Sequence, residues 1–204
     1  MQKMNFYSYK LDHDYGLAPN PFGEHCTLAV CKSSIRKNKN LTINDWVIGT
    51  GSKALGYEYS VIYAMQVQEI VTFDEYWSDK RFDYKKPVLN GSLVQMYGDN
   101  FYHTDKTTGE WIQEESAHSV VDKEAHLETD TNGKNVLISK RFWYMGDKAK
   151  KIPDHLIKIC NKGRNMKYRT IDNKLGNEFI LWMKENFAIG ISGDPISWME
   201  YYKL

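Results

Sequence analysis

The sequence predicts an α+β protein, on two observations. Apolar and polar residues alternate along several segments before residue 150, which is the period of a β-strand with one buried face. The clearest helical stripe, with apolar residues spaced three and four apart, comes near the end of the chain. Because strands and helices do not alternate regularly, we expect a mixed, strongly curved sheet or a small β-barrel with about three flanking helices.

The strands expected in the first part of the chain are rich in β-branched and aromatic residues. A loop over Tyr15–Glu24 separates the first two, because its prolines and glycines break regular structure. A Gly-rich turn over Gly49–Lys53 follows the third. The expected strands are Asn5–Leu11, Thr27–Lys32, Asp45–Ile48 and Ser60–Ile70.

The expected helices lie in the middle and at the end of the chain. Thr72 and Glu75 have the spacing of a capping box, which predicts a helix over Phe73–Phe82. Pro153 near the start and Gly163 past the end predict a short helix. The two later helices are expected over Pro153–Asn161 and Gly176–Phe187. Between the first helix and these two we expect a loop over Lys85–Asp99, a hairpin over Phe101–Glu114, a hairpin at Asn132-Gly133 and a strand over Val136–Tyr144.

The composition limits the classes of protein. The 204 residues suit one domain, in which we expect residues 1–150 to form a β-rich core that bears the pocket and residues 151–204 a helical cover. The net charge of +1 disfavours strong non-specific binding of duplex DNA. No segment is apolar enough for a membrane span, and the three cysteines show no disulfide framework. We therefore expect a cytoplasmic protein with reduced thiols.

The loop around Asn20 is the first candidate site. Pro19 and Pro21 restrict the backbone on either side of Asn20, whose amide offers the donors and the acceptor needed to read a base edge. His13 and Asp14, near the start of this segment, can supply acid–base chemistry. The alternative is a structural turn in which Asp14 or Asn20 bonds its own backbone.

The Gly-rich turn over Gly49–Lys53 is the second candidate. Its small residues let backbone N–H groups face an anion, Thr50 and Ser52 add hydroxyls, and Lys53 adds charge. The spacing is not that of a Walker A loop. The alternative is a tight turn between strands.

Further candidates are titratable or aromatic. Asp99 and His118 are possible catalytic groups, although the alternative is a plain turn at Asp99. Arg141 and Trp143, on one face of an expected strand, can grip a phosphate and stack a base, and each stack contributes about 1–3 kcal/mol. The other expected ligand-binding aromatic residues are Trp46 and Tyr63. The alternative for all of these aromatic residues is core packing.

No metal site and no cofactor are expected. Cys26 and Cys31 lie on an expected strand at a spacing that points their side chains to opposite faces. The histidines are scattered, without the pairing of a zinc site. The sequence also lacks the Gly-x-Ser-x-Gly elbow of an acyl-transfer serine.

Together these clusters resemble the nucleotide modification associated domain 2 family, over most of residues 5–150. That family is predicted to work near systems that modify DNA bases in bacteria and their phages, so the resemblance implies a nucleotide or modified-base ligand and leaves the mechanism open. The segments that carry it are Asp14–Phe22, Cys26–Ala29 with Cys31-Lys32, Asp45–Lys53, Tyr63–Met65, Phe73–Trp77, Gly98–Asn100 and Ser139–Tyr144.

A weaker likeness concerns Asp45–Val67. Its strand, Gly–Ser turn and second apolar strand resemble the β-barrel of PUA, EVE and ASCH domains, which bind RNA or modified bases in a pocket. By analogy of fold alone, this likeness implies a PUA-like barrel.

Two functions remain open. In the first, the protein is a binding module, and a free nucleotide or a flipped base enters a pocket between Pro19–Pro21 and Thr50–Ser52. In the second, it is a transferase or hydrolase that acts on a nucleotide or modified base, with His13, Asp14, Asp99 and His118 as its titratable groups. The remaining possibility is an interaction or structural protein, including a phage or host defence factor that sequesters a signalling nucleotide.

Overall fold

The computed structural model describes residues 4–118, 123–163 and 169–203, and its chain forms two compact units. Unit 1 comprises Met1–Tyr15, Asn40–Gln68 and Ser139–Leu204, and unit 2 comprises Gly16–Lys39 and Glu69–Ile138. The mixed α+β class is confirmed, because both units combine strands with helices. The expected single domain over residues 1–204 stays a prediction.

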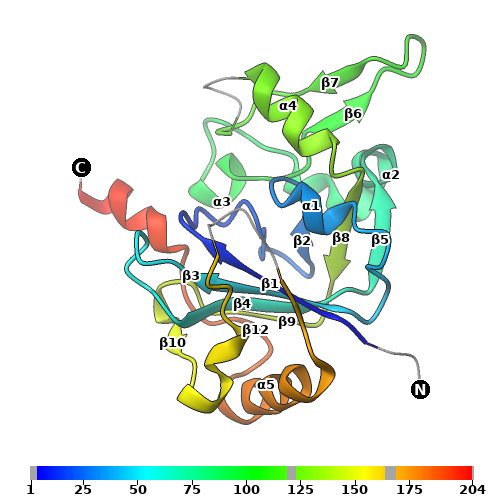
Figure 1. The fold of residues 1–204 in the computed structure, drawn as a ribbon. Coiled ribbons are helices and arrows are strands. Elements are labelled where there is room, and N and C mark those ends of the chain that lie inside the picture. The colour runs from blue at the N-terminus through cyan, green and yellow to red at the C-terminus, as the bar shows by residue number, and fades with distance from the viewer. Residues whose placement is uncertain (1–3, 119–122, 164–168, 204) are drawn as a thin grey trace. The chain divides into compact units, whose positions relative to one another are not determined.

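Unit 1 is built on a mixed seven-stranded sheet in the order β11-β1-β3-β4-β9-β12, with β10 paired to β4 (Figure 1). β1 is parallel to β3 and β12 to β9, whereas β11 with β1, β3 with β4, β4 with β9 and β10 with β4 are antiparallel. Within the described ranges β11 and β12 end the sheet without pairing to each other, so it is open and not a closed barrel. The strands are β1 (Phe6–Leu11), β3 (Trp46–Gly51), β4 (Ser60–Gln66), β9 (Phe142–Tyr144), β10 (Lys150–Lys151), β11 (Arg169–Ile171) and β12 (Gly190–Ile191).

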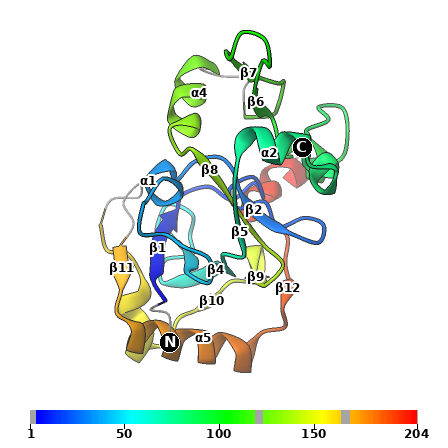
Figure 2. The same cartoon turned by 90° about the vertical axis from the view of Figure 1, so that its right-hand side faces the viewer.

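Helix α5 (Asn173–Asn186) covers one face of this sheet (Figures 1 and 2). Phe179 and Met183 are fully buried in a core that also contains Trp46 and Trp143, as the apolar stripe predicts. The Asp172 side chain accepts a hydrogen bond from the Leu175 backbone at 3.0 Å and caps the helix. The expected helix over Pro153–Asn161 is a 3-10 helix, and the short helices of unit 1 are η2 (Gly146–Lys148), η3 (Asp154–Ile159) and η4 (Ile196–Lys203).

Unit 2 combines a three-stranded sheet, β2-β8-β5, with the separate hairpin β6–β7 (Figure 2). Thr72 and Glu75 form the predicted capping box, and helix α2 begins at Phe73. The strands are β2 (Cys26–Leu28), β5 (Glu69–Thr72), β6 (Tyr102–Thr104), β7 (Trp111–Gln113) and β8 (Asn135–Ser139), and the helices are α1 (Ser33–Arg36), α2 (Phe73–Ser78), η1 (Lys80–Lys85), α3 (Leu93–Met96) and α4 (Lys123–Thr131).

The predicted Gly-rich turn is wrong in part, because β3 continues through Gly51. A Cβ atom at Gly49 would lie 2.3 Å from the ring of Tyr63, and one at Gly51 would lie 2.4 Å from the Tyr57 carbonyl oxygen. Real Cβ atoms do not approach so closely, so these glycines allow close packing beside the strand. The turn itself follows at residues 53–56.

Other strand boundaries also differ from the prediction. The expected Ser60–Ile70 strand divides into β4 and β5, and Val136–Tyr144 divides into β8 and β9. At the second break the Ser139 hydroxyl bonds both the N–H and the C=O of Arg141 at 2.9 Å, a local alternative to ladder bonds. Ser139, Arg141 and Trp143 therefore do not share one strand.

Three more expectations are corrected in unit 2. The expected Thr27–Lys32 strand ends early, since β2 stops at Leu28. Asn132-Gly133 is not a hairpin turn, because helix α4 precedes it and strand β8 follows. The expected loop over Lys85–Asp99 contains helix α3, which a second capping box starts.

Among the residues that the structure describes, no helix is both long enough and apolar enough to span a bilayer.

Candidate functional site

A fully buried group of polar side chains lies inside unit 2. We call Asn20, Thr27, Tyr76, Lys85 and Asp99 the closed cluster; each is at most 1% exposed. Asp99 accepts hydrogen bonds from the Thr27 and Tyr76 hydroxyls, both at 2.7 Å. The Lys85 ammonium donates to the Asn20 carbonyl at 3.0 Å and to its side-chain oxygen at 2.6 Å. The Asn20 amide donates to the Tyr97 carbonyl at 2.9 Å.

The charges of the closed cluster are costly to bury. Burial lowers the pKa of Lys85 to about 8, and the nearby Asp99 opposes this shift. Burial raises the pKa of Asp99, with Lys85 acting in the opposite direction. Hydrogen bonds to these groups compensate the free-energy cost of their burial, so this arrangement is suited to hold the segments of unit 2 together.

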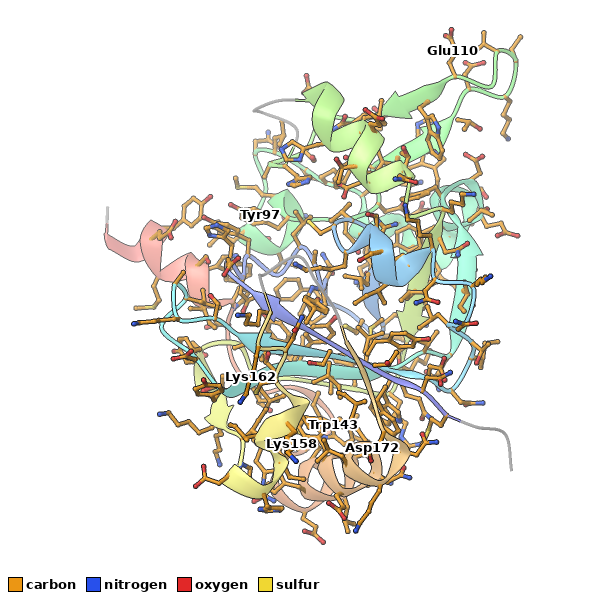
Figure 3. The ribbon with its side chains drawn as sticks, viewed as in Figure 1. Tyr97, Glu110, Trp143, Lys158, Lys162 and Asp172 are labelled. Atoms are coloured by element: carbon orange, nitrogen blue, oxygen red, sulfur yellow. The ribbon has the colours of Figure 1, made fainter. Side chains whose placement is uncertain are left out.

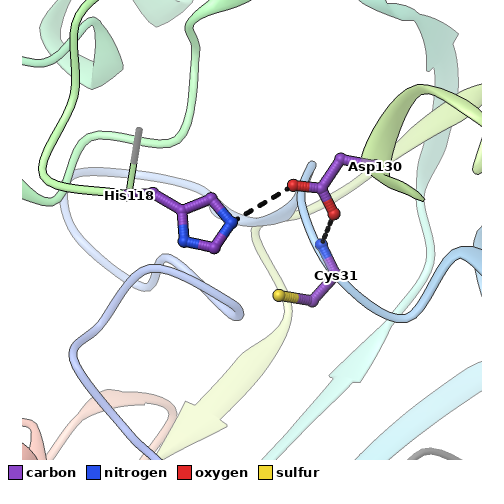
Figure 4. Close-up of side chains that lie close together, drawn as sticks. All are labelled: Cys31, His118 and Asp130. Atoms are coloured by element: carbon purple, nitrogen blue, oxygen red, sulfur yellow. Dashed lines mark hydrogen bonds and ion pairs between the residues drawn. The ribbon is translucent and has the colours of Figure 1, made fainter. Parts of the chain in front are cut away.

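A second group in unit 2 has a different character. Cys31, His118 and Asp130, which we call the open cluster, bring a sulfur, a ring nitrogen and a carboxylate oxygen within 4.8 Å of one another (Figure 4). His118 Nε2 lies 3.3 Å from Asp130 Oδ2. Cys31 and His118 are half-buried, and Asp130 is buried. In Figure 4 the sulfur and the carboxylate both lie toward Nε2 of the ring.

The carboxylate of the open cluster is held by neighbours. The Cys31 backbone N–H donates to Asp130 Oδ1 at 2.5 Å, and the Tyr102 hydroxyl donates to Oδ2 at 3.2 Å. His118 Nε2 is buried and has no hydrogen-bond partner among the described residues, although it faces Asp130. The cluster therefore combines a fixed carboxylate with an imidazole nitrogen whose hydrogen-bonding capacity is unused there.

Arg36 forms the frame of the open cluster. Its guanidinium donates to the Cys31, Asp130 and Asn135 carbonyls at 2.8, 2.7 and 2.9 Å. Burial lowers the pKa of Arg36 to about 10. A Cβ atom at Gly133 would lie 2.3 Å from this guanidinium, so the glycine makes room for it. One buried side chain thus ties α1, the end of α4 and the start of β8 to the Cys31 backbone.

Cys31 adopts an unusual backbone conformation. Its φ is 55° and that of Lys32 is 44°, and left-handed φ values are uncommon outside glycine. Such conformations cluster at functional sites. Burial, and then the Asp130 charge, raise the pKa of the thiol to about 11, so the group is a thiol at neutral pH unless another cation replaces its proton.

The predicted aromatic and cationic residues of unit 1 come together in part. Trp46 and Trp143 stack at 5.6 Å between ring centroids, and the Arg141 guanidinium lies 6.0 Å from the Trp46 ring. Figure 3 shows Trp143 on the side of the sheet that α5 covers. Both indoles are almost fully buried, so the alternative of core packing accounts for their positions. A groove of about 340 Å³ is lined by Trp46, Arg141, Lys184, Gln66 and Asn177, among others.

His13 and Asp14 are neighbours in sequence with different surroundings. His13 is exposed and lines a groove of about 290 Å³ with Asp12 and Glu200. Asp14 is buried and accepts a hydrogen bond from the Tyr144 hydroxyl at 2.7 Å and one from the Ile196 backbone at 3.2 Å. Asp14 thereby anchors the start of η4.

The remaining predicted ligand-binding residues lie in or beside β3 and β4. The Thr50 hydroxyl donates to the Tyr9 carbonyl at 3.2 Å, and Ser52 accepts from the Leu55 backbone at 3.2 Å. Tyr63 shares a hydrogen bond of 2.7 Å with the Tyr9 hydroxyl. Lys53 is exposed. Asn20 belongs to unit 2 and Ser52 to unit 1, so the pocket expected between their loops stays a prediction.

The open cluster contains residues that sequence reasoning missed. His118 was expected as a catalytic group, but its partners Cys31 and Asp130 were not, and neither was Arg36. Cys31 lies in a segment of the family resemblance, which was the available signal. The prediction that Cys31 is not a metal ligand assumed that Cys31 lies on a strand together with Cys26, whereas strand β2 ends at Leu28. Asp130 lies on a helix that was not predicted.

Comparison with known proteins supports the family resemblance. The model of nucleotide modification associated domain 2 matches residues 3–202, nearly the whole chain. Searches of curated proteins and of solved structures found no match. The matched range includes both clusters of unit 2 and the groove of unit 1. Because the match extends over nearly the whole chain, the chain belongs to the nucleotide modification associated domain 2 family.

Proposed function

We propose that this protein is an enzyme, a hydrolase or transferase, that acts on a nucleotide or modified base at the open cluster. The observation that carries the proposal is the convergence of the Cys31 sulfur, the His118 ring and the Asp130 carboxylate within 4.8 Å. The family association with nucleotide modification supplies the substrate class. Free cysteines and such a substrate are consistent with a cytoplasmic location, which remains part of the proposal.

The residues suit attack on an electrophilic carbon or phosphorus atom. The imidazole of His118 can accept the proton of an attacking group, and Asp130 is fixed beside it by Cys31 and Tyr102. In hydrolysis, water is the only co-reactant: its oxygen bonds to the attacked atom as the bond from that atom to the leaving group breaks. One proton of the water passes to His118 and from there to the leaving group, and the other stays on the hydroxyl of the product. Cys31 and His118 are half-buried, and Asp130 is buried.

The test is turnover. Protein is incubated with nucleotides, modified deoxynucleosides and modified DNA, and the products are analysed by mass spectrometry. We expect one substrate to change mass, with activity lost in Cys31→Ser and kept in Cys160→Ser, whose cysteine lies in unit 1. Unchanged masses across the panel, or equal activity of both variants, would contradict the proposal.

The second candidate is the binding module, and the groove of unit 1 favours it. Arg141 and Lys184 supply two cations there, and Gln66 and Asn177 supply amides. Its volume of about 340 Å³ is near the lower end of ligand pockets, roughly 300–1,000 Å³. Calorimetry with nucleotides should show binding that weakens with salt and in Arg141→Ala. Unaltered affinity in Arg141→Ala and Lys184→Ala would exclude this groove.

A further inference from the structure

We propose that the open cluster binds a divalent transition-metal ion, zinc by its donor set, through Cys31 Sγ, His118 Nε2 and an Asp130 carboxylate oxygen. This inference rests on the proposed function for its substrate class and gives His118 another role there, but metal binding can be measured without any substrate. Sulfur, imidazole nitrogen and carboxylate oxygen are the ligand types that zinc takes in proteins.

The distances fit one ion. Zinc bonds of about 2.0–2.3 Å in a tetrahedron separate neighbouring ligand atoms by roughly 3.3–3.7 Å. His118 Nε2 and Asp130 Oδ2 are 3.3 Å apart, and all three donors fall within 4.8 Å of one another. The nitrogen–oxygen pair therefore already has the spacing of two zinc ligands, and the sulfur within 4.8 Å would have to come closer to complete the set.

The orientation of the His118 ring distinguishes a metal site from a catalytic triad of thiol, imidazole and carboxylate. In a thiol–imidazole–carboxylate triad, one ring nitrogen faces the nucleophile and the other faces the carboxylate. Here the sulfur and the carboxylate both lie toward Nε2 (Figure 4). His118 Nε2 approaches Asp130 without forming a hydrogen bond, and no other described residue partners it. Three donor atoms within 4.8 Å of one another suit a shared cation.

The surroundings supply the outer contacts that metal ligands require. The Tyr102 hydroxyl and the Cys31 backbone N–H orient the Asp130 carboxylate, and the buried Arg36 fixes the Cys31 backbone. Three protein ligands leave a fourth tetrahedral position for water, which is the composition of catalytic zinc sites. A metal there would acidify that water, and His118 would serve as a ligand instead of as the base.

The test uses the full-length protein freed of metal with a chelator. Cobalt(II) is titrated while visible absorption is recorded, and zinc is then added. We expect a saturating 1:1 spectrum of a thiolate-bound tetrahedral ion, which zinc abolishes. Cys31→Ser should remove the sulfur-to-metal charge-transfer band, whereas Cys26→Ser and Cys160→Ser should keep it. No saturable spectrum, or one unchanged by Cys31→Ser, would overturn the inference.

Graded variants sharpen the result. Tyr102→Phe removes an outer hydrogen bond and should weaken cobalt binding about 10- to 100-fold. His118→Ala and Asp130→Asn remove ligands and should weaken it more than Tyr102→Phe does. His155→Ala, in unit 1, is the matched control and should bind normally. Circular dichroism of each variant confirms folding before the affinities are compared.

The two proposals fail separately. Saturable cobalt binding without turnover of any nucleotide would support the metal site and contradict the enzyme. Turnover that survives complete chelation, in a protein that binds no cobalt, would support the enzyme and overturn the metal site.

Discussion

The two polar clusters of unit 2 each contain a buried aspartate, but the surroundings of their other members differ. In the closed cluster Asp99 and Lys85 are fully buried, and hydroxyl, carbonyl and amide partners bond their charges. In the open cluster Cys31 and His118 reach the surface, and the buried Nε2 of His118 lacks a hydrogen-bond partner among the described residues. Hydrogen-bonded burial stabilises a fold, whereas a polar group with unused bonding capacity remains available for chemistry.

The largest expected effect is on the closed cluster. Asp99→Ala removes the acceptor of two buried hydroxyls and the charge nearest Lys85, so the free energy of unfolding should fall by about 3–5 kcal/mol. Urea denaturation measures this change. The control is Asp83→Ala, because Asp83 is 57% exposed and pairs with Lys86, and its loss should cost less than about 1 kcal/mol. Equal losses in the two variants would remove the distinction.

The second prediction concerns pH. The pKa of Lys85 in the folded protein, about 8, lies below its ordinary value of 10.5, so between these values the unfolded chain binds more protons. The stability of the wild type relative to Lys85→Met should therefore rise with pH across this window, by about 1 kcal/mol per pH unit, and stay constant below it. Denaturation at several pH values tests this. A flat difference would mean that Lys85 keeps an ordinary pKa, and a falling one would mean that folding raises this pKa.

The third prediction concerns the frame of the open cluster. Gly133→Ala places a Cβ atom against the Arg36 guanidinium, at 2.3 Å from its carbon in the present geometry. Overpacking of this kind should lower the free energy of unfolding by about 1–3 kcal/mol. It should also weaken cobalt binding, because Arg36 holds the Cys31 carbonyl. The control is Gly109→Ala, whose Cβ atom would meet no atom of the described residues within 4 Å. Its cost should come from its left-handed φ, without effect on cobalt binding.

The smallest effect lies outside both clusters. Thr72→Ala breaks the capping box of α2, in which the Thr72 hydroxyl accepts from the Glu75 backbone at 3.2 Å. The expected loss is about 1 kcal/mol of unfolding free energy, with metal binding unchanged. Thr72→Ser should restore the stability, because serine caps equally well. A change in cobalt affinity would show that α2 couples to the open cluster.

Local rules predicted much of the secondary structure. The capping box at Thr72, the β6–β7 hairpin and the stripe of α5 each follow from residues a few positions apart. Strand boundaries failed where the cause lies elsewhere in the chain. Gly49 and Gly51 look like a turn in sequence, yet the Tyr63 ring and the Tyr57 backbone occupy the space beside them. The break before β9 depends on a bond between Ser139 and Arg141.

The candidate sites were harder to predict for the same reason. Asn20 was singled out for its two flanking prolines, but its partner Lys85 lies 65 residues away. Asp130 and the Cys31 backbone are 99 residues apart, and no spacing rule joins them. Only His118 of the open cluster was anticipated, because a histidine is chemically conspicuous alone. Long-range packing decides which of the conspicuous residues have partners.

The central claim is that one cluster of unit 2 holds the fold and the other carries the chemistry, and its two cysteines test it most directly. Cys26 is fully buried beside the charges of the closed cluster, whereas Cys31 belongs to the open one. Turnover of the substrate that the mass-spectrometry panel identifies should be compared in Cys26→Ser and Cys31→Ser at equal concentrations of folded protein. We predict wild-type turnover for Cys26→Ser and none for Cys31→Ser. Retained turnover in Cys31→Ser, or equal loss in both, would contradict the account.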